Sequence, residues 1–275
     1  MGNLARIARI FFAICIAGLA AQQFFDGEFR PVLIPAYATH FPGETILVYL
    51  LSVILILAAV AITLNRNAYT ASLLLGFVFL ALLLFCHVPY EGWIDPAGRQ
   101  TIGAWNNAFK ESTLAGSAFI VAGSLFHEQP FDKKAALSVP PEVLIPLGSI
   151  LFSVTMVVFG IEHFLFAEFV KTLVPDWIPG HLFWTYFAAV ALIGSGSAIL
   201  FQTRSRLAAM LLGIMIFLWV LLLHIPRAAV APATDKGNEL SSVFEALGFS
   251  GIAILLACCY KPRTGALHVA APVRA

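Results

Sequence analysis

Eight apolar runs, each about as long as a membrane-spanning helix, divide this chain of 275 residues. A helix needs about 20 mostly apolar residues to cross the hydrocarbon core of a bilayer. We therefore expect an all-α integral membrane protein with eight transmembrane helices. The fourth and eighth runs begin with polar residues, so six spans with two interfacial helices are an alternative. The predicted spans are 7–25, 45–64, 68–87, 106–126, 144–168, 181–202, 206–224 and 240–260.

The composition supports this class of protein and excludes others. Hydrophobic residues make up 60% of the chain and charged residues only 11%, whereas a soluble domain carries about 25% charged residues. A soluble enzyme of this size could not bury so much apolar surface. The net charge of +1 also argues against nucleic-acid binding. The expected environment is the lipid bilayer.

The first apolar run and the cysteines are compatible with more than one role. Arg6 and Arg9 accompany an apolar stretch in the manner of a signal peptide, but the stretch continues into Phe24 and Phe25. We expect a retained first helix. The four cysteines lie in or beside apolar runs without a CxxC pair, which predicts small hydrophobic residues rather than a disulfide framework or a metal site. They are Cys15, Cys86, Cys258 and Cys259.

Lysine and arginine residues predict the orientation in the membrane. With the N-terminus in the cytoplasm, ten of them fall on the cytoplasmic side and six on the opposite side. Cytoplasmic loops of membrane proteins carry the excess of these residues. Both termini are therefore expected in the cytoplasm, and the longer loops are expected to face the periplasm or the cell exterior.

An internal repeat relates the two halves of the chain. Positions 41–89 align without a gap with positions 178–226 and share 15 identities in 49 positions. His87 falls on His224 in this alignment. Each half then contains four helices, and an even number of spans returns the chain to the same side of the membrane. The halves are therefore predicted to be parallel repeats, related by a pseudo-twofold axis along the membrane normal.

The repeat also sets the expected domain organisation. A first four-helix repeat covers 1–126, a cytoplasmic linker covers 127–142, and a second repeat with a short cytoplasmic tail covers 143–275. With a gap of three residues, Glu111 falls on Glu245.

Several ionisable side chains fall into one layer near the outer membrane interface, at a helix rise of about 1.5 Å per residue. Such groups are costly inside a membrane and therefore indicate function. The sequence predicts a polar site here, whose catalytic role is unknown and which is not expected to hold a metal. Any haem bound by its imidazoles would be non-covalent, because no CxxCH sequence is present. The candidates are His87, His224, Glu111, Glu245, Glu162, His163 and Lys110.

Each candidate also has a purely structural interpretation. The two paired histidines stand at helix ends just before prolines, where the helix dipole and interfacial water favour them. Glu162 and His163 point about 100° apart on a helix, so one is expected to face the bundle and the other the interface. Asn106 is expected to cap the fourth helix, with Glu111 near the positive end of its dipole. A cavity beside the residues would favour a site, and tight packing would favour the structural interpretation.

The segment WNNAFKE at 105–111, followed by the small residues LAGSA at 114–118, resembles the last helix of DoxX-like membrane proteins. The first helix of each half, with Gly18 or Gly160, is similar to the opening helix of that family. The resemblance implies a tandem of two four-helix DoxX-like units in a bacterial inner membrane. It also implies an accessory or subunit role, since the founding example is linked to a thiosulfate:quinone oxidoreductase.

The leading hypothesis from the sequence is a non-enzymatic subunit or accessory protein of a membrane respiratory or redox complex, with a membrane protein as its partner. One alternative is a membrane redox enzyme with a quinone or non-covalent haem site near the periplasmic face. Another is a small-solute transporter, which parallel repeats permit. The sequence contains no P-loop, dinucleotide-binding, serine-hydrolase or HExxH motif.

Overall fold

The computed structural model describes residues 2–35, 42–126, 128, 139–230 and 237–260. Within these residues every regular element is helical, which confirms the predicted all-α class. The physical reason is that a backbone surrounded by lipid must satisfy its hydrogen bonds within its own segment.

Four long helical segments come from the first half of the chain. The third was predicted to end at His87 but continues through two π-helical turns to Ile94. Two 3-10 turns, Ala97–Arg99 and Ile102–Trp105, then lead into the fourth helix. The bounds are α1 Gly2–Asp26, α2 Glu44–Thr63, α3 Ala68–Leu82, η2 Leu83–His87, η3 Tyr90–Ile94 and α4 Asn106–Leu125.

The second half also contains four long helical segments, and their bounds differ from those predicted. Its first helix was expected over 144–168 but begins at Pro141, inside the expected linker, and ends at Leu165. Proline suits the first helical turn because that turn has no partner for its N–H. In the rest of the expected linker the structure describes only Glu128 and the two residues before Pro141. Residues 127 and 129–138 lie outside the described residues. The bounds are α5 Pro141–Leu165, α6 Ala167–Val170, η6 Lys171–Leu173, α7 His181–Leu200, α8 Ser205–Trp219, η7 Val220–His224, α9 Ile225–Val230 and α10 Asn238–Cys259.

The two short links join helices that pack against each other, α2 against α3 and α7 against α8. Asn65 and Asn67 each adopt a left-handed backbone with φ of 52°, and Gln202 and Arg204 do the same with φ of 57° and 50°. Asparagine enters this region more readily than most residues. These residues therefore turn the chain within a few positions.

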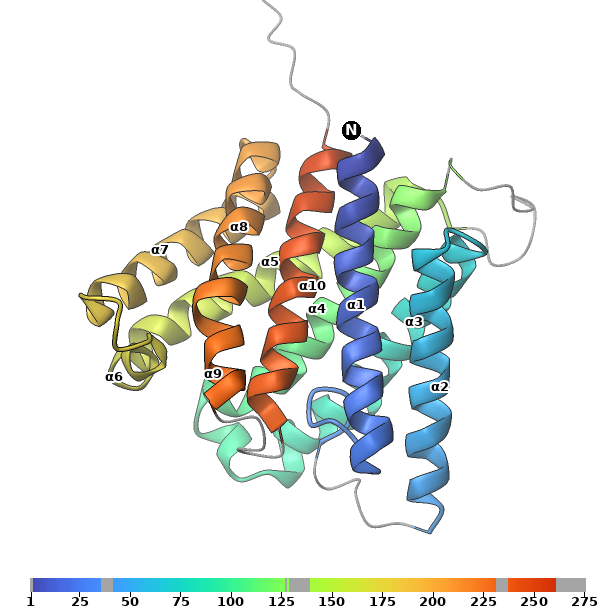
Figure 1. Ribbon diagram of the computed structural model, residues 1–275, viewed down its shortest axis with the longest axis horizontal. Helices are drawn as coiled ribbons and strands as arrows, with labels where there is room; N and C mark the ends of the chain where they lie inside the picture. The colour runs from blue at the N-terminus through green and yellow to red at the C-terminus, as the bar shows by residue number, and fades with distance from the viewer. Residues whose placement is uncertain (1, 36–41, 127, 129–138, 231–236, 261–275) are drawn as a thin grey trace, which may run out of the picture.

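The two halves are interlocked through their first helices. α1 packs most extensively against α10 and then against α2, while α5 packs against both α7 and α4. Figure 1 shows α1 and α10 side by side, with α7 and α8 on one side of this pair and α2 and α3 on the other. α4 and α10 also contact each other. Hydrophobic runs do not predict that the first helix of one half packs against the last helix of the other, because they do not specify which half a helix packs against.

Seven helical segments of the described chain are long and apolar enough to cross a membrane. Large apolar side chains on their outer faces are exposed, as expected for helices that meet lipid. The protein is therefore a multi-pass α-helical membrane protein. α4 is not one of the seven, because its opening turns carry polar residues such as Lys110 and Glu111, but most of its residues are buried. The segments are α1, α2, α3 to η3, α5, α7, α8 to α9, and α10.

Glycine residues set two close crossings between the halves. A Cβ atom on Gly116 of α4 would lie 2.7 Å from the carbonyl oxygen of Gly148 on α5. A Cβ atom on Gly251 of α10 would lie 2.6 Å from the carbonyl oxygen of Ala8 on α1. Small residues allow helix backbones to approach closely where no hydrophobic force drives association.

Replacing Gly116 by alanine is expected to lower the free energy of unfolding by about 1–3 kcal/mol, because the added methyl group overpacks the crossing. The matched control is Gly194→Ala in α7, where a Cβ atom would meet nothing within 4 Å. That control should gain about 0.5–1 kcal/mol from helix propensity. Unfolding in detergent measures both variants, and a change of the same sign in both would contradict the close α4–α5 crossing.

Candidate functional site

Lys110 and Glu245 form an ion pair where α4 meets α10. The Nζ atom of Lys110 lies 2.8 Å from Oε2 of Glu245, and the two side chains are 19% and 4% exposed. Two charges tolerate this burial only while each compensates the other. The pair therefore ties the last helix of the first half to the last helix of the second.

Glu111 follows Lys110 on α4 and is fully buried. Neither of its carboxyl oxygens has a hydrogen-bond partner within the described chain. It lies near enough to Glu245 for the two groups to repel each other when both are charged. Of the predicted site residues, Glu111 has the least compensation for a charge.

Glu162 of α5 faces the start of α4. When the Asn106 amide is turned so that its nitrogen faces Glu162, that nitrogen lies 3.1 Å from Oε1 and 2.7 Å from Oε2. The prediction that Asn106 caps α4 is therefore wrong. Trp105 occupies the N-cap position and makes no side-chain capping bond. The buried carboxyl group takes the amide because leaving it without a donor would be costly.

His163 turns toward α8 instead, as adjacent helix positions require. Its Nδ1 donates a hydrogen bond to the carbonyl oxygen of Phe159 at 2.7 Å. Its ring stacks on Trp219 with 6.5 Å between the ring centroids. Both contacts are packing contacts, and they place His163 on a different face of α5 from Glu162.

The two histidines paired by the sequence each end a π-helical turn, η2 and η7. Pro89 and Pro226 follow two residues later. A proline has no N–H for the preceding turn and its ring displaces the carbonyl there, so a widened turn at this point has an identifiable cause.

The surroundings of the two histidines differ. His87 is fully buried, and its Nε2 donates a hydrogen bond to the carbonyl oxygen of Val32 at 3.0 Å. Its Nδ1 has no partner within the described chain. His224 is only partly shielded by its neighbours and lies within electrostatic range of Lys110 and Glu239. His87 is thus held by the segment after α1, and His224 lies nearer the ion pair of α4 and α10.

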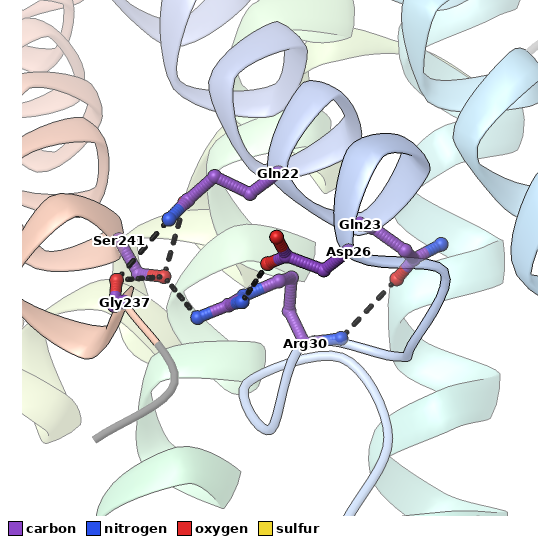
Figure 2. Close-up of polar contacts among 6 residues, drawn as sticks. All are labelled: Gln22, Gln23, Asp26, Arg30, Gly237 and Ser241. Carbon is purple, nitrogen blue, oxygen red and sulfur yellow. Dashed lines mark hydrogen bonds and ion pairs between the residues drawn. The ribbon is translucent and has the colours of Figure 1, made fainter. Parts of the chain in front are cut away.

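A second buried polar network, which sequence reasoning did not single out, joins the end of α1 to the start of α10. The buried Arg30 guanidinium donates to Asp26 Oδ2 at 2.8 Å and to Ser241 Oγ at 3.0 Å. Gln22 donates to the carbonyl oxygen of Gly237 at 3.1 Å and accepts from Ser241 at 3.1 Å. Figure 2 shows Gln22 and Arg30 both reaching Ser241.

One signal in the sequence could have revealed this network. Gln22, Gln23 and Asp26 follow an unbroken apolar stretch at 10–21 of α1, and each is too polar to face lipid cheaply. Gln23 is fully buried and donates to the carbonyl oxygen of Val48 at 3.0 Å and to Ser52 Oγ at 3.1 Å. It therefore ties α1 to α2, while Gln22 ties α1 to α10.

Two polar contacts occupy matching positions relative to the close helix crossings. The crossings are Gly148 with Gly116, and Ala8 with Gly251. On the first helix of each half, the polar residue lies 14 positions after the crossing residue. Its partner lies ten positions before the crossing residue on the last helix of a half. By the same count Lys110 is equivalent to Glu245, so the alignment of Glu111 with Glu245 is one residue out of register with these contacts. The matching contacts are Glu162 with Asn106 and Gln22 with Ser241.

A surface pocket of ≈ 400 Å³ opens near the start of α4. All seven predicted site residues are described by the structure, and none of them lines this pocket. The described residues also contain no group of three or more side chains that could hold a metal ion. Most of the predicted residues lie in helix contacts away from this pocket. The pocket is lined by Gly98, Arg99, Gln100, Thr101, Ile102, Trp105 and Phe109.

The fold and these contacts define a multi-pass α-helical membrane protein with ion pairs and polar contacts buried between its two halves. No family model matches the chain, and neither a curated protein nor a solved structure matches it.

Proposed function

We propose that the protein is a non-enzymatic subunit or accessory protein of a membrane respiratory or redox complex in a bacterial inner membrane. The observation that carries this proposal is that most of the predicted polar residues contact one another or backbone carbonyl groups, away from the pocket. A catalytic site needs its polar groups beside a space for substrate. Polar groups that join helices instead suit a framework that presents its outer surface to a partner.

The same contacts support two DoxX-like four-helix repeats related by a pseudo-twofold axis along the membrane normal. The polar contacts recur at equal separations from the two crossings, and the π-helical turns recur 137 residues apart. A further pair of contacts recurs between the third and last helices of each half. Gly76 meets Phe119, and Gly213 meets Ile254. In this proposal each repeat packs its first helix on the last helix of the other.

α4 is the eighth membrane span in this proposal. Its 20 residues rise about 30 Å at 1.5 Å per residue, which matches a hydrocarbon core of about 30 Å. Lys110 and Asn106 are directed at α10 and α5 rather than at lipid. A helix enclosed by its neighbours does not need an apolar outer face, since its ionisable groups find partners inside the bundle.

Both termini are cytoplasmic in this proposal, and cysteine labelling tests it. The start of α1 and the end of α10 lie on the same side of the molecule (Figure 1). The orientation is predicted from sixteen lysine and arginine residues, and six of these lie outside the described residues. In a variant without native cysteines, an impermeant thiol reagent applied to intact cells should label a cysteine at 235 but not one at 133. The opposite pattern would reverse the orientation.

Purification from native membranes in a mild detergent tests the main proposal. We expect a second membrane protein at a fixed ratio, and no visible absorbance that belongs to this chain alone. A chain that purifies by itself with a stoichiometric haem or quinone would contradict the accessory role and support a redox enzyme.

One observation favours that redox alternative. The pocket is lined by Trp105 and Phe109, whose aromatic rings suit a flat apolar ring such as that of a quinone. A short-chain quinone analogue that binds there should quench the fluorescence of Trp105. The matched control is Trp105→Phe, which keeps an aromatic ring in the pocket but removes the fluorescent side chain. Quenching that persists in this variant would mean that the analogue binds elsewhere.

A further inference from the structure

The helices around Lys110 carry more acidic groups than that lysine can balance. Lys110 pairs with Glu245 and lies within electrostatic range of Glu162. Glu111 lies within electrostatic range of Glu245. Ionisation of all three carboxyl groups would place three negative charges against one ammonium group inside the helix bundle, where uncompensated charge is costly.

Hydrogen bonding distinguishes the three carboxyl groups. Glu245 accepts the Lys110 ammonium group at 2.8 Å. Glu162 faces the Asn106 amide nitrogen. Glu111 is 0% exposed, and neither oxygen has a donor within the described chain. Glu111 is therefore the group for which ionisation is most unfavourable.

We propose that Glu111 is a proton-binding site, a carboxylic acid that remains protonated at neutral pH in the contact region of α4 and α10. An isolated buried carboxylate takes up a proton in preference to remaining charged, since protonation removes the cost of desolvating a charge. This proposal does not depend on the accessory role, because it rests only on the burial and partners of one side chain.

The groups on the helices packed around α4 do not offer Glu111 a compensating charge. Glu245 on α10 repels a charged Glu111, and Lys110 on α4 itself is engaged with Glu245. On η2, His87 Nε2 donates to the carbonyl oxygen of Val32, and its Nδ1 has no hydrogen-bond partner within the described chain, so His87 does not bond Glu111. α5 contributes Glu162, which is acidic, and its neighbour His163, which is bonded within α5.

Proton occupancy at Glu111 is coupled to the packing of the two halves. Loss of the proton would place a second negative charge beside Glu245 and weaken the contact between α4 and α10. A proton here is therefore a ligand that stabilises the interlocked arrangement, in the sense that any species bound only by the folded state stabilises it.

Infrared spectroscopy of the full-length protein in lipid tests the proposal. At neutral pH the protein should show the carbonyl stretch of a protonated carboxylic acid above the amide I band, and Glu111→Gln should lose it. The matched control, Glu44→Gln, replaces a half-buried carboxylate at the start of α2 and should keep the band. A difference spectrum in which Glu111→Gln loses a carboxylate band instead would overturn the proposal.

A measurement on the unmodified protein keeps the proposal testable if the variant does not fold. Dicyclohexylcarbodiimide reacts with protonated carboxyl groups in apolar surroundings, and peptide mass spectrometry locates the adduct. We expect an adduct at Glu111 at neutral pH and none at Glu44. Modification of Glu44 without modification of Glu111 would contradict a protonated Glu111.

Discussion

Replacing Lys110 by methionine is expected to lower the free energy of unfolding by about 3 kcal/mol or more, because it leaves Glu245 buried without its counter-charge. Methionine keeps the length of the side chain and removes only the ammonium group. The control is Lys171→Met, which breaks a more exposed pair with Glu168 and should cost less than about 1 kcal/mol. Denaturant unfolding in detergent micelles measures both variants.

The double variant Lys110→Met/Glu245→Met separates the loss of a pair from the exposure of an unpaired charge. Replacing both partners by apolar groups of similar size often costs little, so the double variant should recover most of the stability that the single variant loses. A double variant as unstable as Lys110→Met, or a Lys110→Met loss no larger than that of Lys171→Met, would contradict a buried pair between α4 and α10.

Replacing Arg30 by methionine should have the second largest effect, a loss of about 2–3 kcal/mol, because hydrogen bonds to a charged group are worth about 1.5–3 kcal/mol. The change removes the donors of Asp26 and Ser241 together. The loss should be smaller than for Lys110, because the Asp26 side chain is 50% exposed and water can replace its partner. The exposed Arg99 supplies the control, Arg99→Met, which should change stability by less than about 0.5 kcal/mol.

Hydrogen exchange locates the effect of the Arg30 change. Amides at the start of α10, near Ser241, should exchange faster in Arg30→Met than in the unmodified protein, while those at the end of α10 should be unaffected. Faster exchange along the whole helix would point to general destabilisation instead. No change at the start of α10 would contradict the network drawn in Figure 2.

The helices and their short links were predictable from the sequence because each depends on local chemistry. An apolar run long enough to cross lipid has few alternatives to a helix. Turn residues such as Asn65 and Asn67 then mark the links, since asparagine tolerates the left-handed backbone found there. The predicted helix ends were less accurate. The third helical segment continues past Pro89, because the backbone accommodates this proline with a π-helical turn and does not end there.

The partners of the polar residues were not predictable, because each depends on which helices meet. The sequence around Asn106 predicts a helix cap, because it does not show that Glu162 of another helix lies beside this asparagine. The equivalence of Lys110 with Glu245 is hidden in the sequence, because lysine and glutamate are not identities and the nearby Glu111 offers a better match. The close contacts at Gly116 and Gly251 show which positions of α4 correspond to which positions of α10, and the sequence alignment does not show this.

The central feature of the fold is that each half packs its first helix against the last helix of the other half. Gln22 provides the most direct measurement, because Asn106 and Ser241 occupy equivalent positions on α4 and α10. Two variants without native cysteines carry the pairs Gln22→Cys/Ser241→Cys and Gln22→Cys/Asn106→Cys, with a protease site in the linker at 129–138. A short bifunctional thiol reagent is applied to the folded protein before cleavage.

We expect the pair at 22 and 241 to cross-link efficiently, so that the cleaved halves remain joined and the uncut chain remains monomeric. The pair at 22 and 106 should cross-link poorly, and its halves should separate after cleavage. Efficient cross-linking of 22 with 106 but not with 241 would mean that α1 packs on the last helix of its own half, and would contradict the interlocked arrangement.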